Sequence, residues 1–250
     1  MELYRYRAID GNLERLLRNH EAWFASATSF NDPFDCQLPI HFSPTEKQAR
    51  AFLKSAHERS GSTKGAAKRE FEEARRSGGK DWLKVWAEKV SRSLGPDTIA
   101  NASLLCFSEK QSDILMFSHY GQMHRGVSIG FDFGGLVGTR KVLPVKYTDA
   151  YPLLDYLKLR DRPKDLITAM FLSKAEQWKY EQEWRFIRFE EPAGLVRFDP
   201  QFFRSVTFGC CCSAREESDV RLWCRLGGLN VQFFRARKSD TTFALEIEPA

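Results

Sequence analysis

The chain has 250 residues with a net charge of +5, and its hydrophobic (42%) and aromatic (13%) fractions suffice for one large core. No run approaches 18 apolar residues and the first residues carry no signal-peptide pattern, so we expect a cytoplasmic protein with no membrane partner. Three of the six cysteines are consecutive and none forms a CxxC pair, which argues against a disulfide framework and a zinc site.

Hydrophobic periodicity and turn residues predict an alternation of short strands and helices. In chain order we expect a strand at 2–8, a helix at 11–19, a strand at 22–26, a loop at 29–35, two or three helices at about 45–60, 64–77 and 80–94, a strand at 103–108, a helix at 113–123, strands at 126–133 and 141–147, helices at 153–160 and 163–177, strands at 184–189, 194–198 and 204–210, a helix at 214–226, and strands at 230–236 and 242–247.

This order predicts one α+β domain, residues 1–250, with a mostly antiparallel or split sheet. The helices at 45–95 separate two strand-rich regions, so we interpret them as an insertion in that domain. The strands are short and clustered, and helices lie between only some of them.

The positive charge is concentrated in this insertion. Residues 45–95 carry 13 Lys and Arg against 7 Asp and Glu, a net charge of +6, which leaves −1 for the rest of the chain. Interleaved Phe52, Phe71, Trp82 and Trp86 suit a nucleic-acid-binding segment that contacts phosphates and stacks on bases. The alternative is a set of amphipathic helices with the aromatic side chains facing a core and the lysines facing solvent.

Two carboxylates stand out at the start of the strand predicted for 184–189. Glu181 and Glu183 are two residues apart, so on an extended chain they share a face about 7 Å apart. Aromatic neighbours raise a carboxyl pKa by desolvation, while Arg185 or Lys179 lowers it, and such opposed effects are common at catalytic sites. The alternative is an edge strand with an ordinary Glu–Arg pair in solvent.

The first strand offers a phosphate site. Arg5 and Arg7 share one face and are flanked by Tyr4 and Tyr6. Arginine binds phosphate with two parallel hydrogen bonds, and an adjacent ring packs on a base or sugar. The alternative is an exposed edge strand whose arginines reach into water.

Polar residues between the strands complete the set of candidates. Asn31, Asp32 and Asp35 place polar groups between two aromatic rings in the 29–35 loop, for which the alternative is a capped structural turn. Three such oxygens can bind a divalent ion, but their spacing matches no ion-binding loop, so we expect no metal. Ser108 ends a buried strand but lies in no GxSxG, which disfavours a Ser–His hydrolase. His119 and Tyr120 come late in a helix near a glycine, where side chains can face a cleft, although a helical histidine is often structural.

Five blocks of the sequence resemble an uncharacterised bacterial family, a domain of unknown function, with YRYR, FNDPFD, CFS, SHY and YExEWR motifs; they are Tyr4–Arg7, Phe30–Asp35, Cys106–Ser108, Ser118–Asp132 and Tyr180–Arg185. More distantly, the order Arg, Ser, Glu-x-Glu resembles the ADP-ribosyltransferase superfamily. Members of that group carry an Arg on the first strand, a Ser on a middle strand and a Glu before a later strand. No Gly-x-Gly-x-x-Gly is present, so Rossmann-type NAD binding is not expected.

This resemblance implies an ADP-ribosyltransferase-like split sheet and ADP-ribosyl transfer or NAD hydrolysis, with NAD as the substrate. It implies that Arg7 or Arg5 contacts the pyrophosphate and that Ser108 supports the nicotinamide ribose. Glu183 would stabilise the oxocarbenium-like transition state, and Glu181 would orient the acceptor. The other residues implied at the NAD site, three of them by ring stacking, are His119, Tyr120, Tyr180, Asn31 and Asp32.

The same resemblance suggests a bacterial toxin or phage-defence effector with a nucleic-acid or protein acceptor and an antitoxin or defence-system partner. The alternative function is a nucleic-acid-binding or non-catalytic partner-binding module that uses the helices at 45–95. The two are separable, because only the enzyme should lose its activity in Glu183→Gln, with little change in its melting temperature.

Overall fold

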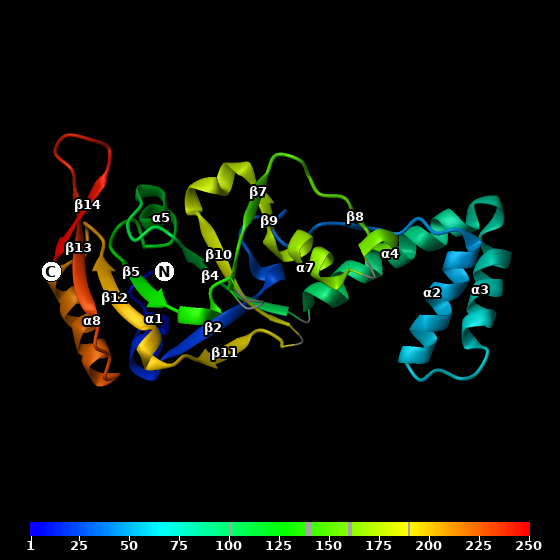
Figure 1. The fold of residues 1–250 in the computed structure, drawn as a ribbon, viewed down its shortest axis with the longest axis horizontal. Helices are drawn as coiled ribbons and strands as arrows, with labels where there is room; N and C mark the ends of the chain where they lie inside the picture. Colours follow the sequence, from blue (N-terminus) through cyan, green and yellow to red (C-terminus); the bar gives the residue numbers. More distant parts are fainter. Residues whose placement is uncertain (101, 139–141, 160–161, 190) are drawn as a thin grey trace.

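A large, mostly antiparallel β-sheet lies at the centre of the chain in the computed structural model (Figure 1). The structure describes residues 1–100, 102–138, 142–159, 162–189 and 191–250. The ten strands of this sheet are β1 (Glu2–Arg7), β2 (Glu21–Ser26), β4 (Ala102–Ser108), β5 (Val127–Asp132), β6 (Val142–Pro144), β10 (Glu183–Phe189), β11 (Gly194–Arg197), β12 (Phe203–Phe208), β13 (Gln232–Lys238) and β14 (Leu245–Pro249).

The sheet branches at β4. Along one edge β4 pairs with β10, where Glu183 lies opposite Ser108. Along the other edge it pairs with β1 at one end, where Tyr4 lies opposite Ser108, and with β2 at the other, where Ala25 lies opposite Leu104. One branch continues through β1, β5, β12, β13 and β14, and the other through β2 and β11. The predicted mixture of helices with a mostly antiparallel sheet is therefore confirmed.

Aromatic side chains fill the main core, as expected from the abundance of Phe. The helices α1 (Gly11–Asn19) and α8 (Ala214–Leu226) pack against each other at one end of the sheet. Their contact is close, because a Cβ at Gly227 would lie 2.0 Å from the carbonyl oxygen of Leu17. Buried rings of the core are Phe24, Phe107, Phe131, Phe133, Phe198, Phe203 and Phe208.

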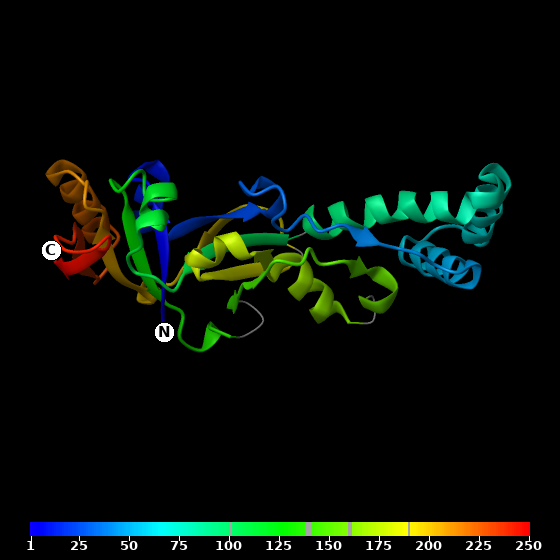
Figure 2. The same ribbon diagram turned by 90° about the horizontal axis from the view of Figure 1, so that it is seen from above.

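The basic segment forms a helical arm, which we define as α2 (Glu46–Arg59), α3 (Ala66–Ser77) and α4 (Trp82–Ala100). The arm projects away from the sheet on the long helix α4 (Figures 1 and 2). Phe71, Trp82 and Trp86 are buried inside it, and Phe52 packs against them. The aromatic side chains proposed for base stacking therefore form the interior of the arm.

Two predicted helices end earlier than the sequence suggested. The helix predicted at 163–177 is α7 (Pro163–Leu172), because Ser173–Ala175 forms strand β9, which pairs in parallel with β7 (Lys146–Thr148). A 3-10 helix, η4 (Glu176–Glu181), then leads into β10. The helix predicted at 113–123 is α5 (Ile114–His119), since Gln122, Met123 and His124 adopt positive φ angles.

Two other predicted elements are divided. The strand expected at 141–147 is β6 and β7, and the helix expected at 153–160 is β8 (Leu154–Asp155) followed by α6 (Tyr156–Leu159). Residues 141 and 160 lie outside the described part of the chain. The remaining short elements are β3 (Ile40–His41), which pairs with β8, η1 (Ala27–Ser29), η2 (Gly79–Asp81), η3 (Gly134–Leu136) and η5 (Pro200–Phe202). Among the described residues, no helix has the length and apolar character that crossing a membrane requires.

Candidate functional site

A cleft of about 250 Å³ opens beside the adjacent strands β1, β4 and β10. Since β4 lies between β1 and β10, side chains from the two outer strands come from backbones about 10 Å apart. Six of the ten residues predicted from the sequence lie in the wall of this cleft: Arg5, Arg7, Asn31, Tyr120, Glu181 and Glu183.

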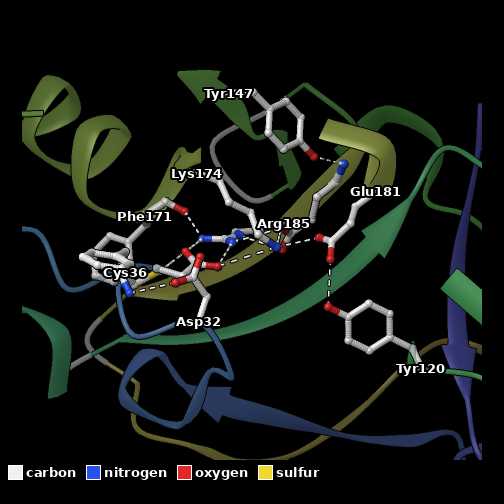
Figure 3. Close-up of polar contacts among 11 residues, drawn as sticks. Asp32, Cys36, Tyr120, Tyr147, Phe171, Lys174, Glu181 and Arg185 are labelled. Carbon is white, nitrogen blue, oxygen red and sulfur yellow. Dashed lines mark hydrogen bonds and ion pairs between the residues drawn. The ribbon is translucent and has the colours of Figure 1, made fainter. Parts of the chain in front are cut away.

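A buried lysine joins the two glutamates. Lys174 Nζ lies 2.5 Å from Glu181 Oε2 and 2.8 Å from Glu183 Oε2, and 3.8 Å from Asp35 Oδ2 (Figure 3). The left-handed residue Gln182 (φ 44°) turns the chain between the two glutamates, so both side chains reach one ammonium group. Strand β9 places Lys174 there, which the predicted helix would not have done.

A second cation, Arg185, lies behind the glutamates and does not itself line the cleft. It is fully buried, and its Nε and Nη2 donate hydrogen bonds to the two oxygens of Glu183 at 2.7 and 3.0 Å. Its Nη1 and Nη2 also donate to the carboxylate of Asp35 at 2.8 and 2.6 Å, and Nη1 donates to the Phe171 carbonyl at 2.8 Å. We call Asp35, Lys174, Glu181, Glu183 and Arg185 the ion network.

The ion network holds three carboxylates and two cations, and this excess of negative charge gives the two glutamates different pKa values. Burial alone would raise the pKa of Glu183, but Arg185 and Lys174 outweigh it and lower that pKa to about 2. Burial raises the pKa of Glu181 even though Lys174 opposes the effect. Glu183 is therefore a fixed negative charge, and Glu181 is the carboxyl that gains and loses a proton more easily.

Two tyrosines orient the glutamates. The Tyr120 hydroxyl donates a hydrogen bond to Glu181 Oε1 at 2.8 Å, and the Tyr147 hydroxyl accepts one from the backbone N–H of Glu183 at 2.7 Å. Burial and the charge of Glu181 raise the pKa of Tyr120, so its hydroxyl stays protonated and able to donate. Both carboxylates are thus fixed in place before any ligand binds.

The β1 side of the cleft is cationic. Arg5 Nη1 donates a hydrogen bond to the Cys106 carbonyl at 2.8 Å, which leaves the other guanidinium N–H groups available. Burial, and then the nearby charge of Arg7, lower the pKa of Arg5 to about 10, so it remains a cation at neutral pH. Arg7 Nη2 lies 3.7 Å from Asp10 Oδ2.

Four of the predicted residues do not line the cleft. Ser108 is buried, and its hydroxyl donates to the Glu181 carbonyl at 2.5 Å, so it supports the turn that carries that glutamate. Asp32 Oδ1 accepts a hydrogen bond from the Phe34 N–H, which is the capped turn considered as the alternative. His119 is exposed, and its ring centroid lies 6.3 Å from that of Tyr180.

Asp35, Lys174 and Arg185 were not among the predicted site residues, although Asp35 belongs to the polar cluster of the 29–35 loop and Arg185 was expected to lower a glutamate pKa, as it does. Lys179, the other cation considered, pairs instead with Glu176. A signal for Arg185 was present, because it shares a face with Glu183 and Ile187, the buried positions of β10, and is therefore a charged residue on the buried side of a strand. Of the described residues, no group of three or more His, Cys, Asp or Glu is arranged to hold a metal ion.

Comparison with known proteins identifies one family. Neither a curated protein nor a solved structure matches the chain. The matching family model is described as a protein of unknown function (DUF2971), and it spans Tyr120 and four members of the ion network but neither Asp35 nor the two arginines of β1. Residues 116–186 thus match a family of unknown function, as the motifs in this part of the sequence suggested.

Proposed function

We propose that the chain uses NAD as a substrate, either as an ADP-ribosyltransferase or as an NAD glycohydrolase. The observation that supports this most is the adjacency of the three motif strands. Strand β4, which carries the Ser motif, is hydrogen-bonded to the Arg strand β1 and to the Glu strand β10. Ser108 of β4 lies opposite Tyr4 of β1 on one side and opposite Glu183 of β10 on the other. Motifs separated by about 180 residues in the sequence meet beside one cleft.

The charges in the cleft are complementary to NAD. Arg5 and Arg7 offer guanidinium groups to a pyrophosphate, for which paired hydrogen bonds to oxygen are the favoured geometry. Glu181 and Glu183 lie two strands away and offer negative charge to the nicotinamide ring, which is a cation in NAD. One cleft therefore provides a cationic side and an anionic side for a molecule that carries both charges.

The reaction breaks the bond between the ribose C1′ and the nicotinamide nitrogen. Nicotinamide leaves as a neutral base with the bonding electron pair, and positive charge develops on C1′ and the ring oxygen. The fixed charge of Glu183 stabilises that cation by preorganised electrostatics. Water or another nucleophile then bonds to C1′ and loses a proton, for which Glu181 is the nearby acceptor because its pKa is raised.

The test is release of nicotinamide from NAD by the purified chain, measured by chromatography with water, duplex DNA, RNA or protein extract as acceptor. We expect turnover by the wild type and a loss of at least about 10²-fold in kcat for Glu181→Gln, which cannot accept the proton. Glu176→Gln, the same change at a position of η4 that does not line the cleft, should leave kcat unchanged.

Two results would contradict the proposal. If the wild type releases no nicotinamide with any of these acceptors and its melting temperature does not rise with NAD, the cleft binds a different ligand. Equal activity of Glu181→Gln and the wild type would show that turnover does not use this site.

A further inference from the structure

Among the residues that the structure describes, most of the Lys and Arg side chains without an ion pair lie in the helical arm. Thirteen Lys and Arg residues lie between residues 45 and 95. Two of them pair with a described carboxylate, Arg50 with Glu72 at 3.3 Å and Lys54 with Glu58 at 3.9 Å. The other eleven make no ion pair within the part of the chain that the structure describes, so their charge is available to a partner.

Four of these cations form a stripe on α3. Lys68 and Arg75, and likewise Arg69 and Arg76, are seven residues apart, so each pair forms a row over two turns and the two rows lie about 100° apart around the helix. Glu72 lies between the rows and pairs with Arg50. All four are exposed, and Phe71, which is buried in the arm, lies beside the row of Lys68 and Arg75, whereas Arg69 and Arg76 lie on the far side of the helix from it. At about 1.5 Å per residue the stripe is about 12 Å long.

The packing inside the arm limits the classes of partner that its surface can bind. Because its aromatic rings are packed inside, the arm presents no ring for stacking on unpaired bases. Insertion into a lipid surface as an amphipathic helix needs an exposed apolar face, but Val85 is the single large hydrophobic residue that is exposed among the described side chains of α2 to α4. What remains is a rigid cationic stripe without an apolar or aromatic complement, which suits a phosphate backbone.

We propose that the α3 stripe binds the backbone of double-stranded nucleic acid without reading its sequence. One strand of a duplex presents a phosphate about every 3.4 Å along the axis, so a stripe of about 12 Å faces three to four phosphates. This inference does not depend on NAD chemistry, because it rests on the charge and packing of the arm alone. It also gives a duplex as the first acceptor to test at the cleft.

The test uses the full chain and a fluorescent 20-base-pair duplex of random sequence, with affinity measured by anisotropy from 50 to 200 mM salt. Contacts with three to four phosphates predict a slope of log K against log salt of about −3, and an affinity loss of about 100-fold over this range. The triple variant Lys68→Gln, Arg75→Gln, Arg76→Gln should bind at least about 10-fold more weakly at 50 mM and reduce the slope by about 3.

A matched control tests whether binding depends on the position of the positive charges or only on their number. Arg197→Gln, Arg215→Gln, Arg225→Gln also removes three exposed arginines, which make no ion pair with described residues and lie outside the arm. It should keep the affinity and slope of the wild type, and circular dichroism should show the same helix content in both variants.

Four results would overturn the inference. These are no salt-dependent binding by the wild type at 50 mM, equal weakening in both triple variants, tighter binding of single strands than of the duplex, and equal binding of phosphatidylserine vesicles or an acidic polypeptide. The first two show that the stripe is not a site, and the others that it recognises a different partner.

Discussion

Replacing Glu183 by Gln tests the ion network most directly, because it removes one charge and almost no volume. Arg185 and Lys174 lower the pKa of Glu183 from 4.5 to about 2, and one pKa unit corresponds to about 1.4 kcal/mol. The charge therefore contributes about 3 kcal/mol to the free energy of unfolding at neutral pH, within the range measured when one partner of a buried ion pair is removed. For a chain of this length the melting temperature should fall by about 6–12 °C.

This differs from the expectation drawn from the sequence, in which Glu183→Gln left the melting temperature almost unchanged. The difference arises because Glu183 is buried and bonded to two cations, which its position at the start of a strand did not reveal. Loss of activity in this variant is therefore not separable from loss of stability. Glu181→Gln is the better variant for activity.

The assay is urea unfolding at pH 7, with Glu181→Gln as the matched control two residues away. Because burial raises the pKa of Glu181, its charge does not stabilise the fold, and Gln still accepts the Tyr120 hydrogen bond. We expect its free energy of unfolding to stay within about 1 kcal/mol of the wild type. Equal stability of Glu183→Gln and the wild type, or equal losses in both variants, would refute the reasoning.

Three further predictions concern acid stability, substrate binding and thiol reactivity. The wild type should lose stability as the pH falls from about 4.5 towards 2, because Glu183 binds a proton at a higher pH in the unfolded chain than in the folded one. The midpoint of urea unfolding should therefore fall from pH 5 to 4 to 3, and the part of this fall due to Glu183 should be absent in Glu183→Gln. Arg7→Gln should raise KM for NAD by about 10-fold with little change in kcat, since a phosphate contact distant from C1′ binds ground and transition states alike; a fall in kcat alone would contradict it. Cys211→Ser should remove the fast reaction of the native chain with a disulfide reagent, because Cys211 is exposed, whereas burial raises the pKa of Cys36 and Cys224; a persistent fast phase would contradict this.

The elements that the sequence predicted well are those with local signals at both ends. Helix α8 has the predicted bounds, because Ser213 and Glu216 form a capping box at its start and Gly227 follows its last residue. Strand β5 agrees to within one residue at each end, since its alternating pattern is bounded by Gly126 and Phe133. These signals depend on residues that are close in the sequence.

The prediction failed where distant residues decide the local structure. No Gly or Pro ends the segment 163–177 after Leu172, but pairing with β7 makes Ser173–Ala175 a strand and turns Lys174 towards the glutamates. In the same way, Arg185 bonds to Asp35, which is 150 residues away in the sequence. Local periodicity contains no information on such contacts, so the site predicted from the sequence included the two glutamates but not Lys174 or Arg185.

The direct pairing of β2 with β4 has a consequence for how the chain can diversify. Ala25 lies opposite Leu104 although the whole helical arm separates them in the sequence, so the two strands pair directly and the arm is not part of their hydrogen-bond ladder. An insertion at this point can lengthen, shorten or change its surface while the strands beside the cleft keep their register. The surface of the arm and the residues of the cleft can therefore change independently of each other in evolution.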